Sequence, residues 1–194
     1  MQEFAQDMVN EYKEIHDSIE QYGGFYLGRY ELTGEIGSPT VAKGETVITN
    51  QNWYNLKAAC MKVVNNEGKK ESEIIAKTTM IYGVQWDEVC NWLSTKGHDV
   101  NDSTEWGNCQ ENTLPGSGEK QVAGYDDHWT ANNIYDFAGN CNEWTQEIFF
   151  TGCRVFRGGS YLTQGTLSAF EHNVNYPENG YDDSFSTRPT LYIM

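Results

Sequence analysis

Five cysteines and four histidines are the residues of this chain best suited to metal or redox chemistry. No two cysteines are spaced as Cys-x-x-Cys and no two histidines as His-x-x-x-His. This pattern gives no support for a zinc site, and an odd number of cysteines cannot pair completely. We expect mostly buried, reduced thiols, although a single disulfide remains allowed. The residues concerned are Cys60, Cys90, Cys109, Cys141, Cys153, His16, His98, His128 and His172.

The chain is strongly acidic. Its 28 acidic and 13 basic residues give a formal net charge of −15 at pH 7. Phosphate backbones would be repelled, so we expect no nucleic-acid partner. Calcium or a cationic partner fits this charge better, while solubility explains most of it. No apolar run approaches the ~18 residues that span a bilayer, so no membrane insertion is expected.

A length of 194 residues suits a single domain over 1–194. Apolar residues at steps of three and four predict helices over 4–22, 52–64 and 85–94. Thr49 or Asn50 is the expected N-cap of the second helix. The acidic, amphipathic start is no signal peptide and opens in mid-pattern, which leaves open that the chain is the C-terminal domain of a longer protein.

Strand patterns stand near both ends of the chain. Strands are expected over 24–32 and 189–194, with a short strand and turn over 154–161. Pairing of the first strand with the last would close the domain on itself. Residues 97–133 form a long polar stretch, of the kind that is usually functional or held by an ion. Helices embedded in a loop-rich chain of short strands indicate an α+β class.

An ordered set of motifs resembles the formylglycine-generating-enzyme, or sulfatase-modifying-factor, family. The resemblance implies an α+β, C-type-lectin-like fold of the formylglycine-generating variety, with two or three helices around a small antiparallel sheet and long loops. The motifs are GGFYLGRYELT at 23–33, NWYNLKAAC at 52–60, YGVQWDEVCNWL at 82–93, WGN at 106–108, NNIYDFAGNCNEWTQE at 132–147, CRVFRGGSY at 153–161 and STRPTLYI at 186–193.

The catalytic chemistry of that family does not carry over by resemblance. Its enzymes bind copper through two cysteines, which align with Thr163 and Ser168, and no cysteine follows Cys153. Because Cu(I) needs thiolates, we expect no copper and no enzyme activity. An enzyme of this class with altered chemistry is the alternative, and a copper titration with a cysteine-peptide oxidation assay separates the two.

A closer resemblance is to domains of this fold in bacteriophages and diversity-generating retroelements. Their variable region lies between an RGGSY start and an ending like GFRPTLYI, which here correspond to 157–161 and 186–193. Ser186-Thr187 departs from the Gly-Phe of that ending. The resemblance implies a variable ligand-binding region over 161–186, a protein or cell-surface ligand, a place in the virion (phage tail) or at the cell surface, and a homo-oligomer as one option.

The composition of this region suits recognition, because Tyr with Asn, Ser and Gly is typical of adaptable binding surfaces. Some aromatic side chains should pack inward under the loop, Tyr161 and Phe170 first. A structural virion component whose loop binds nothing remains the third hypothesis. The residues predicted to face a ligand are Leu162, Thr163, Gln164, Thr166, Leu167, Glu171, His172, Asn173, Val174, Asn175, Tyr176, Asn179, Tyr181, Asp182, Asp183, Ser184 and Phe185.

The family resemblance also implies a calcium site around the GNCNEW element. Its ligands fall on Asp136, Gly139, the backbone oxygen of Cys141, and Glu143. Two carboxylates with two carbonyls are hard-oxygen donors that suit calcium. Alternatively, Glu143 caps a turn, or Asp136 pairs with an arginine such as Arg154.

Three neighbouring residues are expected to be structural. Trp144 should lie in the core. Arg157 and Arg188 are expected to bridge buried carboxylates or loop carbonyls.

Overall fold

A computed structural model describes residues 2–150, 152–166 and 169–194 of the chain. Its α-helices are α1 (Gln2–Tyr22), α2 (Trp53–Cys60) and α3 (Gly83–Thr95), and a short 3-10 helix covers Glu71–Glu73. The three predicted helices are therefore present. The expected cap of the second was wrong, because the side chain of Asn52 accepts the hydrogen bond from Asn55 N.

One sheet closes the chain on itself. Its strands are β1 (Tyr26–Leu27), β10 (Pro189–Ile193) and β4 (Ala76–Met80), in the order β1-β10-β4 and all antiparallel. Tyr26 pairs with Leu191, so the predicted pairing of the first and last strands is confirmed. The first strand is only two residues long, much shorter than the predicted 24–32.

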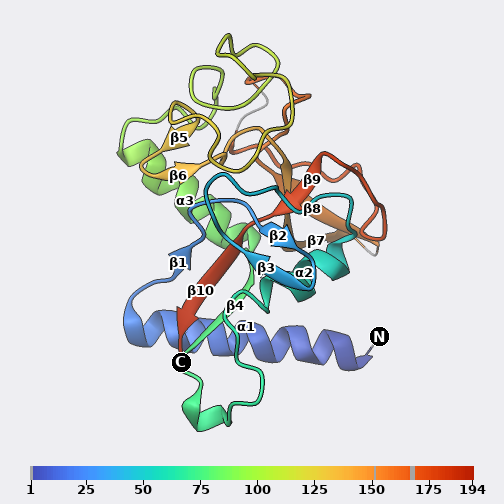
Figure 1. Ribbon diagram of the computed structural model, residues 1–194. Helices are drawn as coiled ribbons and strands as arrows, with labels where there is room; N and C mark the ends of the chain where they lie inside the picture. The colour runs from blue at the N-terminus through green and yellow to red at the C-terminus, as the bar shows by residue number, and fades with distance from the viewer. Residues whose placement is uncertain (1, 151, 167–168) are drawn as a thin grey trace.

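A second sheet borders the segment that contains the predicted ligand-binding region. It contains β8 (Cys153–Arg157), β7 (Asn142–Phe150) and β9 (Phe185–Thr187), in that order. β7 and β8 form an antiparallel hairpin, whereas β9 runs parallel to the start of β7. β8 returns the chain to the end of the sheet where β9 begins, and the chain then crosses β7 to reach its other side. Residues 158–184 form this connection, so the sheet holds both of its ends (Figure 1).

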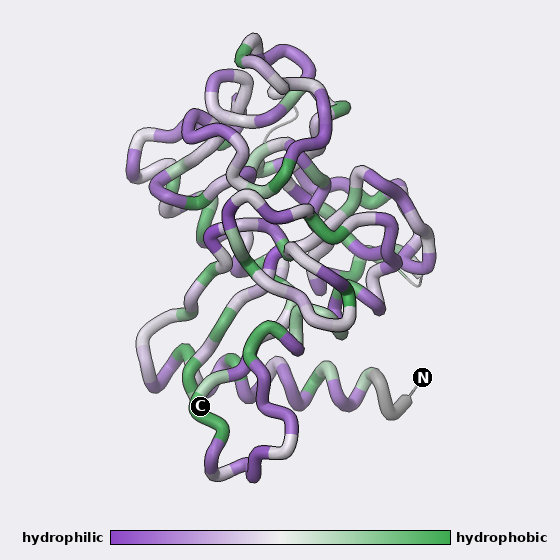
Figure 2. The backbone as a smooth tube through the Cα atoms, in the orientation of Figure 1, coloured by the Kyte–Doolittle hydropathy of each residue, from purple (hydrophilic) through white to green (hydrophobic). Residues whose placement is uncertain are grey.

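Two short hairpins complete the strands: β2 (Thr33–Glu35) with β3 (Ser38–Thr40), and β5 (Thr130–Ala131) with β6 (Ile134–Tyr135). The polar stretch that begins near residue 97 has no strand before β5, as its composition predicted. In Figure 2 the loops at the top of the view are mostly purple and white, with a few green residues.

The long helix α1 lies across the end of the first sheet, beside the C-terminus (Figure 1). Ser18 Oγ donates a 2.7 Å hydrogen bond to the carbonyl of Ile193. Lys57 on α2 pairs with Glu11 at 2.6 Å, and both side chains are nearly buried. These contacts attach α1 to the body of the domain.

The core contains two large apolar clusters, one packed on the second sheet and one built around α3. Trp53, Leu56 and Trp144 pack in one cluster, and Trp86 with Phe137 in another. Trp144 is 0% exposed, which confirms its predicted place in the core. All five cysteines are free, and all but Cys153 are buried. None of the described helices is both long and apolar enough to cross a membrane.

Candidate recognition face

The segment between β8 and β9 is tied to the domain by its backbone. Phe156 and Asn173 exchange two backbone hydrogen bonds, of 3.0 and 3.1 Å. The amide of Glu178 donates to the carbonyl of Gly152, and the amide of Trp53 donates to the carbonyl of Glu178. The segment therefore follows the outer edge of β8 and the start of α2, held there by backbone hydrogen bonds.

We call the described part of 162–185 the recognition face. Most of the side chains predicted to meet a ligand are exposed or half-buried there, and Leu167 lies outside the described residues. The exposed members are Leu162, Gln164, Thr166, His172, Asn175, Asn179, Tyr181 and Asp183; the half-buried members are Thr163, Glu171, Asn173, Val174, Tyr176 and Asp182.

Two residues predicted for the face are not accessible. Phe185 is 5% exposed, and Ser184 is also buried. Phe185 begins β9, whose parallel pairing with β7 turns its ring toward Trp144, at 5.0 Å between ring centroids, and Phe156, at 4.7 Å. Both residues therefore belong to the scaffold.

The inward-packing aromatic side chains also differ from the prediction. Tyr176 stacks on Phe185 with ring centroids 4.7 Å apart, and its hydroxyl donates to the carbonyl of Tyr181. Phe170, which was expected to pack inward, is 42% exposed, and Tyr161 is half-buried. Residue type alone did not distinguish these rings, because their direction depends on which backbone groups pair with β8.

Ion pairs with side chains that are distant in the sequence attach the face to the domain. Arg154 on β8 donates a 2.9 Å hydrogen bond to Glu178, which also accepts from the hydroxyl of Tyr54. Lys120 pairs with Asp183, and this hydrogen bond lowers the pKa of the Asp183 carboxyl. Sequence reasoning missed these contacts, because partners 24 to 124 residues apart leave no local pattern.

A third charged group lies where the face meets α3. Arg157 contacts Asp87 at 2.9 Å and Glu147 at 3.4 Å, and donates to the carbonyl of Phe170. His172 contacts the other oxygen of Glu147 at 2.6 Å. Arg157 thus contacts a loop carbonyl as predicted, whereas the two carboxylates that it bridges are partly exposed and not buried. His172 connects the face to β7.

An exposed apolar tip lies next to the face. Ile148, Phe149 and Phe150, at the end of β7, are each more than half exposed. The bridge between Cys153 and Pro177 places this end of the hairpin beside the face. The sequence shows these three consecutive apolar residues, but a strand buried in a sheet has the same pattern. Their exposure could therefore not be predicted.

The residues of the predicted calcium site are brought together and buried, but Glu143 is already engaged. Both of its carboxylate oxygens accept hydrogen bonds from Arg188, at 2.6 to 3.1 Å. Asp136 Oδ2 accepts from Gly124 N, while Oδ1 is buried without a partner among the described residues. Glu143 does not fit a calcium ion unless Arg188 moves. Calcium at this site therefore stays a prediction.

A carboxylate of the predicted calcium site does pair with an arginine, but the two residues differ from the predicted ones. The predicted pair was Asp136 with Arg154, whereas the observed pair is Glu143 with Arg188. A third carboxylate, Glu31, accepts from Asn140 Nδ2 at 2.7 Å and from Cys141 N at 3.1 Å. Burial raises the pKa of Glu31 and Glu143, and it raises the pKa of Asp136 to about 7.

Of the two positions aligned with the copper cysteines, Thr163 lies in the described part of the chain. The hydroxyl of Thr163 donates to the carbonyl of Ser160 and accepts from its amide, which closes a turn. Ser168 lies outside the described residues. Among the described residues, one group has ligand atoms close enough to share a metal: His16, Asp17 and Glu20, all exposed on α1.

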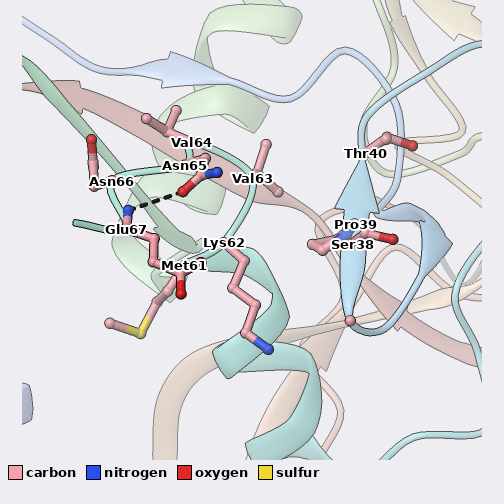
Figure 3. A pocket seen from close by; sticks show the side chains of 11 residues that line it. Ser38, Pro39, Thr40, Met61, Lys62, Val63, Val64, Asn65, Asn66 and Glu67 are labelled. Carbon is pink, nitrogen blue, oxygen red and sulfur yellow. Dashed lines mark hydrogen bonds between the residues drawn. The ribbon is translucent and has the colours of Figure 1, made fainter. Parts of the chain in front are cut away.

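A cavity of about 780 Å³ lies between the β2–β3 turn and the segment that follows α2 (Figure 3). No residue of the recognition face lines it. Its charged wall residues, Lys62 and Glu67, are exposed, and Asn65 caps the turn by accepting from Glu67 N. No buried charged group lines the cavity, so its geometry does not indicate a ligand.

Comparisons with known proteins give the fold. No family model matches the chain, and no curated protein is similar to it in sequence. Among solved structures, Treponema denticola variable protein 1 matches with a TM-score of 0.59 and 16% identity, over 87% of this chain and 84% of that one. The crystal structure of CarF matches with a TM-score of 0.50 and 15% identity, over 75% and 67%. The chain has an α+β, C-type-lectin-like fold, as predicted.

Proposed function

We propose that this chain is a non-catalytic binding module that recognises a protein or cell-surface ligand through the recognition face. One observation carries the proposal: exposed polar and aromatic side chains project from a segment whose backbone is fixed at both ends by β8 and β9. Substitutions of such side chains leave the backbone hydrogen bonds to β8 and α2 intact. A surface that accepts different residues without unfolding is what variable recognition requires.

The likeness to a variable protein supports this proposal through the fold that the two chains share. The motifs shared with formylglycine-generating enzymes and with retroelement variable proteins support it from the sequence. The absence of any cysteine after Cys153 weighs against copper-dependent oxidation. We further propose that the fold is of the formylglycine-generating variety and that the protein acts in a phage tail or at a cell surface.

Sequencing the gene in related isolates is the direct test of variability. The proposal expects differences concentrated in codons 162–183 and at adenine-derived positions. Residues 184–188 are buried and should stay constant. Differences scattered evenly over the exposed surface would contradict variable recognition.

Binding can be tested with labelled protein on a panel of intact bacterial cells and immobilised glycans. Tyr181→Ala and Asn175→Ala remove exposed side chains of the face, whereas Val84→Ser changes an equally exposed residue on α3. We expect the face variants to lose at least tenfold in affinity, which is about 1.4 kcal/mol, and the control to bind as the unmodified chain does. Equal losses in all three variants would contradict the assignment of the site.

Oxidation of a cysteine-containing peptide separates the binding module from the enzyme. The chain loaded with copper should show no turnover above that of free copper. Turnover would restore the enzymatic alternative.

A further inference from the structure

Arg188 lies fully buried where the chain passes from β9 to β10. Its Nε lies 3.1 Å from each oxygen of Glu143, and its Nη2 lies 2.6 Å from Oε1. Nη2 also donates to the carbonyl of Tyr135 at 2.8 Å, and Nη1 donates to the carbonyl of Gly28 at 2.9 Å. We call Glu143 with these two carbonyls the oxygen cradle.

The oxygen cradle has the chemistry of a hard-cation site. A carboxylate that offers both oxygens, together with two backbone carbonyls, is a donor set that calcium accepts. Here all of these oxygens accept from one guanidinium, whose planar fork suits two-oxygen contact with a carboxylate. Arg188 therefore already fills the cradle with a permanent positive charge.

Two free-energy costs would oppose the binding of a second cation at Glu143. It would lie within a few ångströms of the guanidinium, in a buried region where like charges repel strongly. It would also take oxygens from Arg188, and a buried arginine without its partner is strongly destabilising. The three hydrogen bonds to Glu143 cannot be kept while its oxygens bind a metal.

The cradle also connects distant parts of the fold. Gly28 follows β1, Tyr135 ends β6, Glu143 lies on β7, and Arg188 joins β9 to β10. One side chain thus links both sheets and the β5–β6 hairpin. The ring of Phe137, with its centroid 5.8 Å from Cζ of Arg188, lies on the same guanidinium.

We propose that Arg188 is the resident cation of the oxygen cradle, so that the domain folds and presents its recognition face without a calcium ion on Glu143. In this chain an arginine supplies the charge that the family resemblance assigns to calcium. Recognition should then be independent of free calcium.

The first experiment measures calcium binding to the full chain. Thermal unfolding is followed in EDTA and in calcium, alongside isothermal titration with calcium chloride. We expect the same Tm in both solutions and no binding heat. An ion at a hundredfold excess over its Kd would raise Tm by about 5–10 °C. Such a rise, if Glu143→Gln abolished it, would overturn the proposal, because Glu143 would then hold calcium beside Arg188.

The second experiment empties the cradle. Arg188→Met removes the charge at similar length, and we expect calcium to raise the Tm of this variant by several degrees. Arg154→Met is the matched control, since it removes another buried arginine from its carboxylate, Glu178, outside the cradle. The control should show no response to calcium.

The double variant Arg188→Met/Glu143→Gln tests whether Glu143 carries the effect. It removes both charges of the pair, and it should lose the response to calcium. A folded Arg188→Met variant whose Tm calcium leaves unchanged would overturn the proposal, because the cradle would then not be a cation site. If Arg188→Met does not fold, the calcium titration of the unmodified chain decides.

Discussion

Replacing Phe185 by alanine tests the boundary between the recognition face and its scaffold. The ring is 5% exposed and lies between Trp144, Phe156 and Tyr176, with centroids 4.7 to 5.0 Å away. Removing a buried phenylalanine ring loses its transfer free energy and leaves a cavity, at a cost of about 3–5 kcal/mol. Against a typical total of about 5–15 kcal/mol, this is a large fraction of the stability.

Phe170→Ala is the matched control, because it removes the same ring from the same segment. Phe170 is 42% exposed, so a smaller area is lost and solvent can fill the space. We expect a cost of about 1–2 kcal/mol, from the part of the ring that is buried. Burial therefore predicts that Phe185→Ala costs about 1–4 kcal/mol more than Phe170→Ala.

Urea unfolding followed by tryptophan fluorescence measures both variants, with Trp144 reporting directly on the site of Phe185. Equal losses in the two variants, or a loss below about 1 kcal/mol for Phe185→Ala at an unchanged m-value, would refute the assignment of Phe185 to the core. In that case Phe185 would return to the recognition face, where the sequence had placed it.

Three further predictions follow from local geometry and charge. In urea unfolding, Gly139→Ala should lower the free energy of unfolding by several kcal/mol more than Gly97→Ala does. Both glycines have a positive φ, which costs an alanine about 1–2 kcal/mol. At Gly139 the added Cβ would also lie 2.0 Å from the carbonyl oxygen of Asn108, whereas at Gly97 it would meet no atom within 4 Å. Asn52→Ala should cost about 1 kcal/mol in the same assay through loss of the α2 cap, and an unchanged midpoint would contradict the cap. The folded-state pKa of Asp136, about 7, is above the unfolded value of 3.8. The protonated carboxyl therefore contributes fully to the free energy of unfolding below pH 3.8, and this contribution is lost as the pH rises through 7. The urea midpoint should fall over that pH range, and it should fall less in Asp136→Asn.

Local patterns predicted the helices well. The apolar stripes of 4–22, 52–64 and 85–94 join residues three or four positions apart, so the local sequence is enough to predict them. The second helix is shorter than predicted and ends at Cys60. The closing pair of strands was also predicted, since each has its own pattern. By contrast, β7 was missed, because its first five residues are all buried and its last three are all exposed, so the strand lacks the alternation of a half-exposed one.

The candidate site could be located from the sequence but not divided into face and scaffold. The motifs that flank 161–186 marked its ends, and its composition indicated recognition. The inward direction of Phe185 and Tyr176 depends on the parallel pairing of β9 with β7 and on the bridge to β8. These contacts join residues about 15 to 45 positions apart, and no local pattern encodes them.

By itself, the sequence determined the helical stripes, the closing strands, the excess of acidic residues and the absence of a cysteine pair after Cys153. Only the tertiary structure decided which carboxylate meets which cation. Glu143 and Arg188 are 45 residues apart, and either could have paired elsewhere. The free energy of a buried charge depends on the donors and acceptors that the whole fold brings within about 3 Å of it, and that distance exists only once the chain has folded.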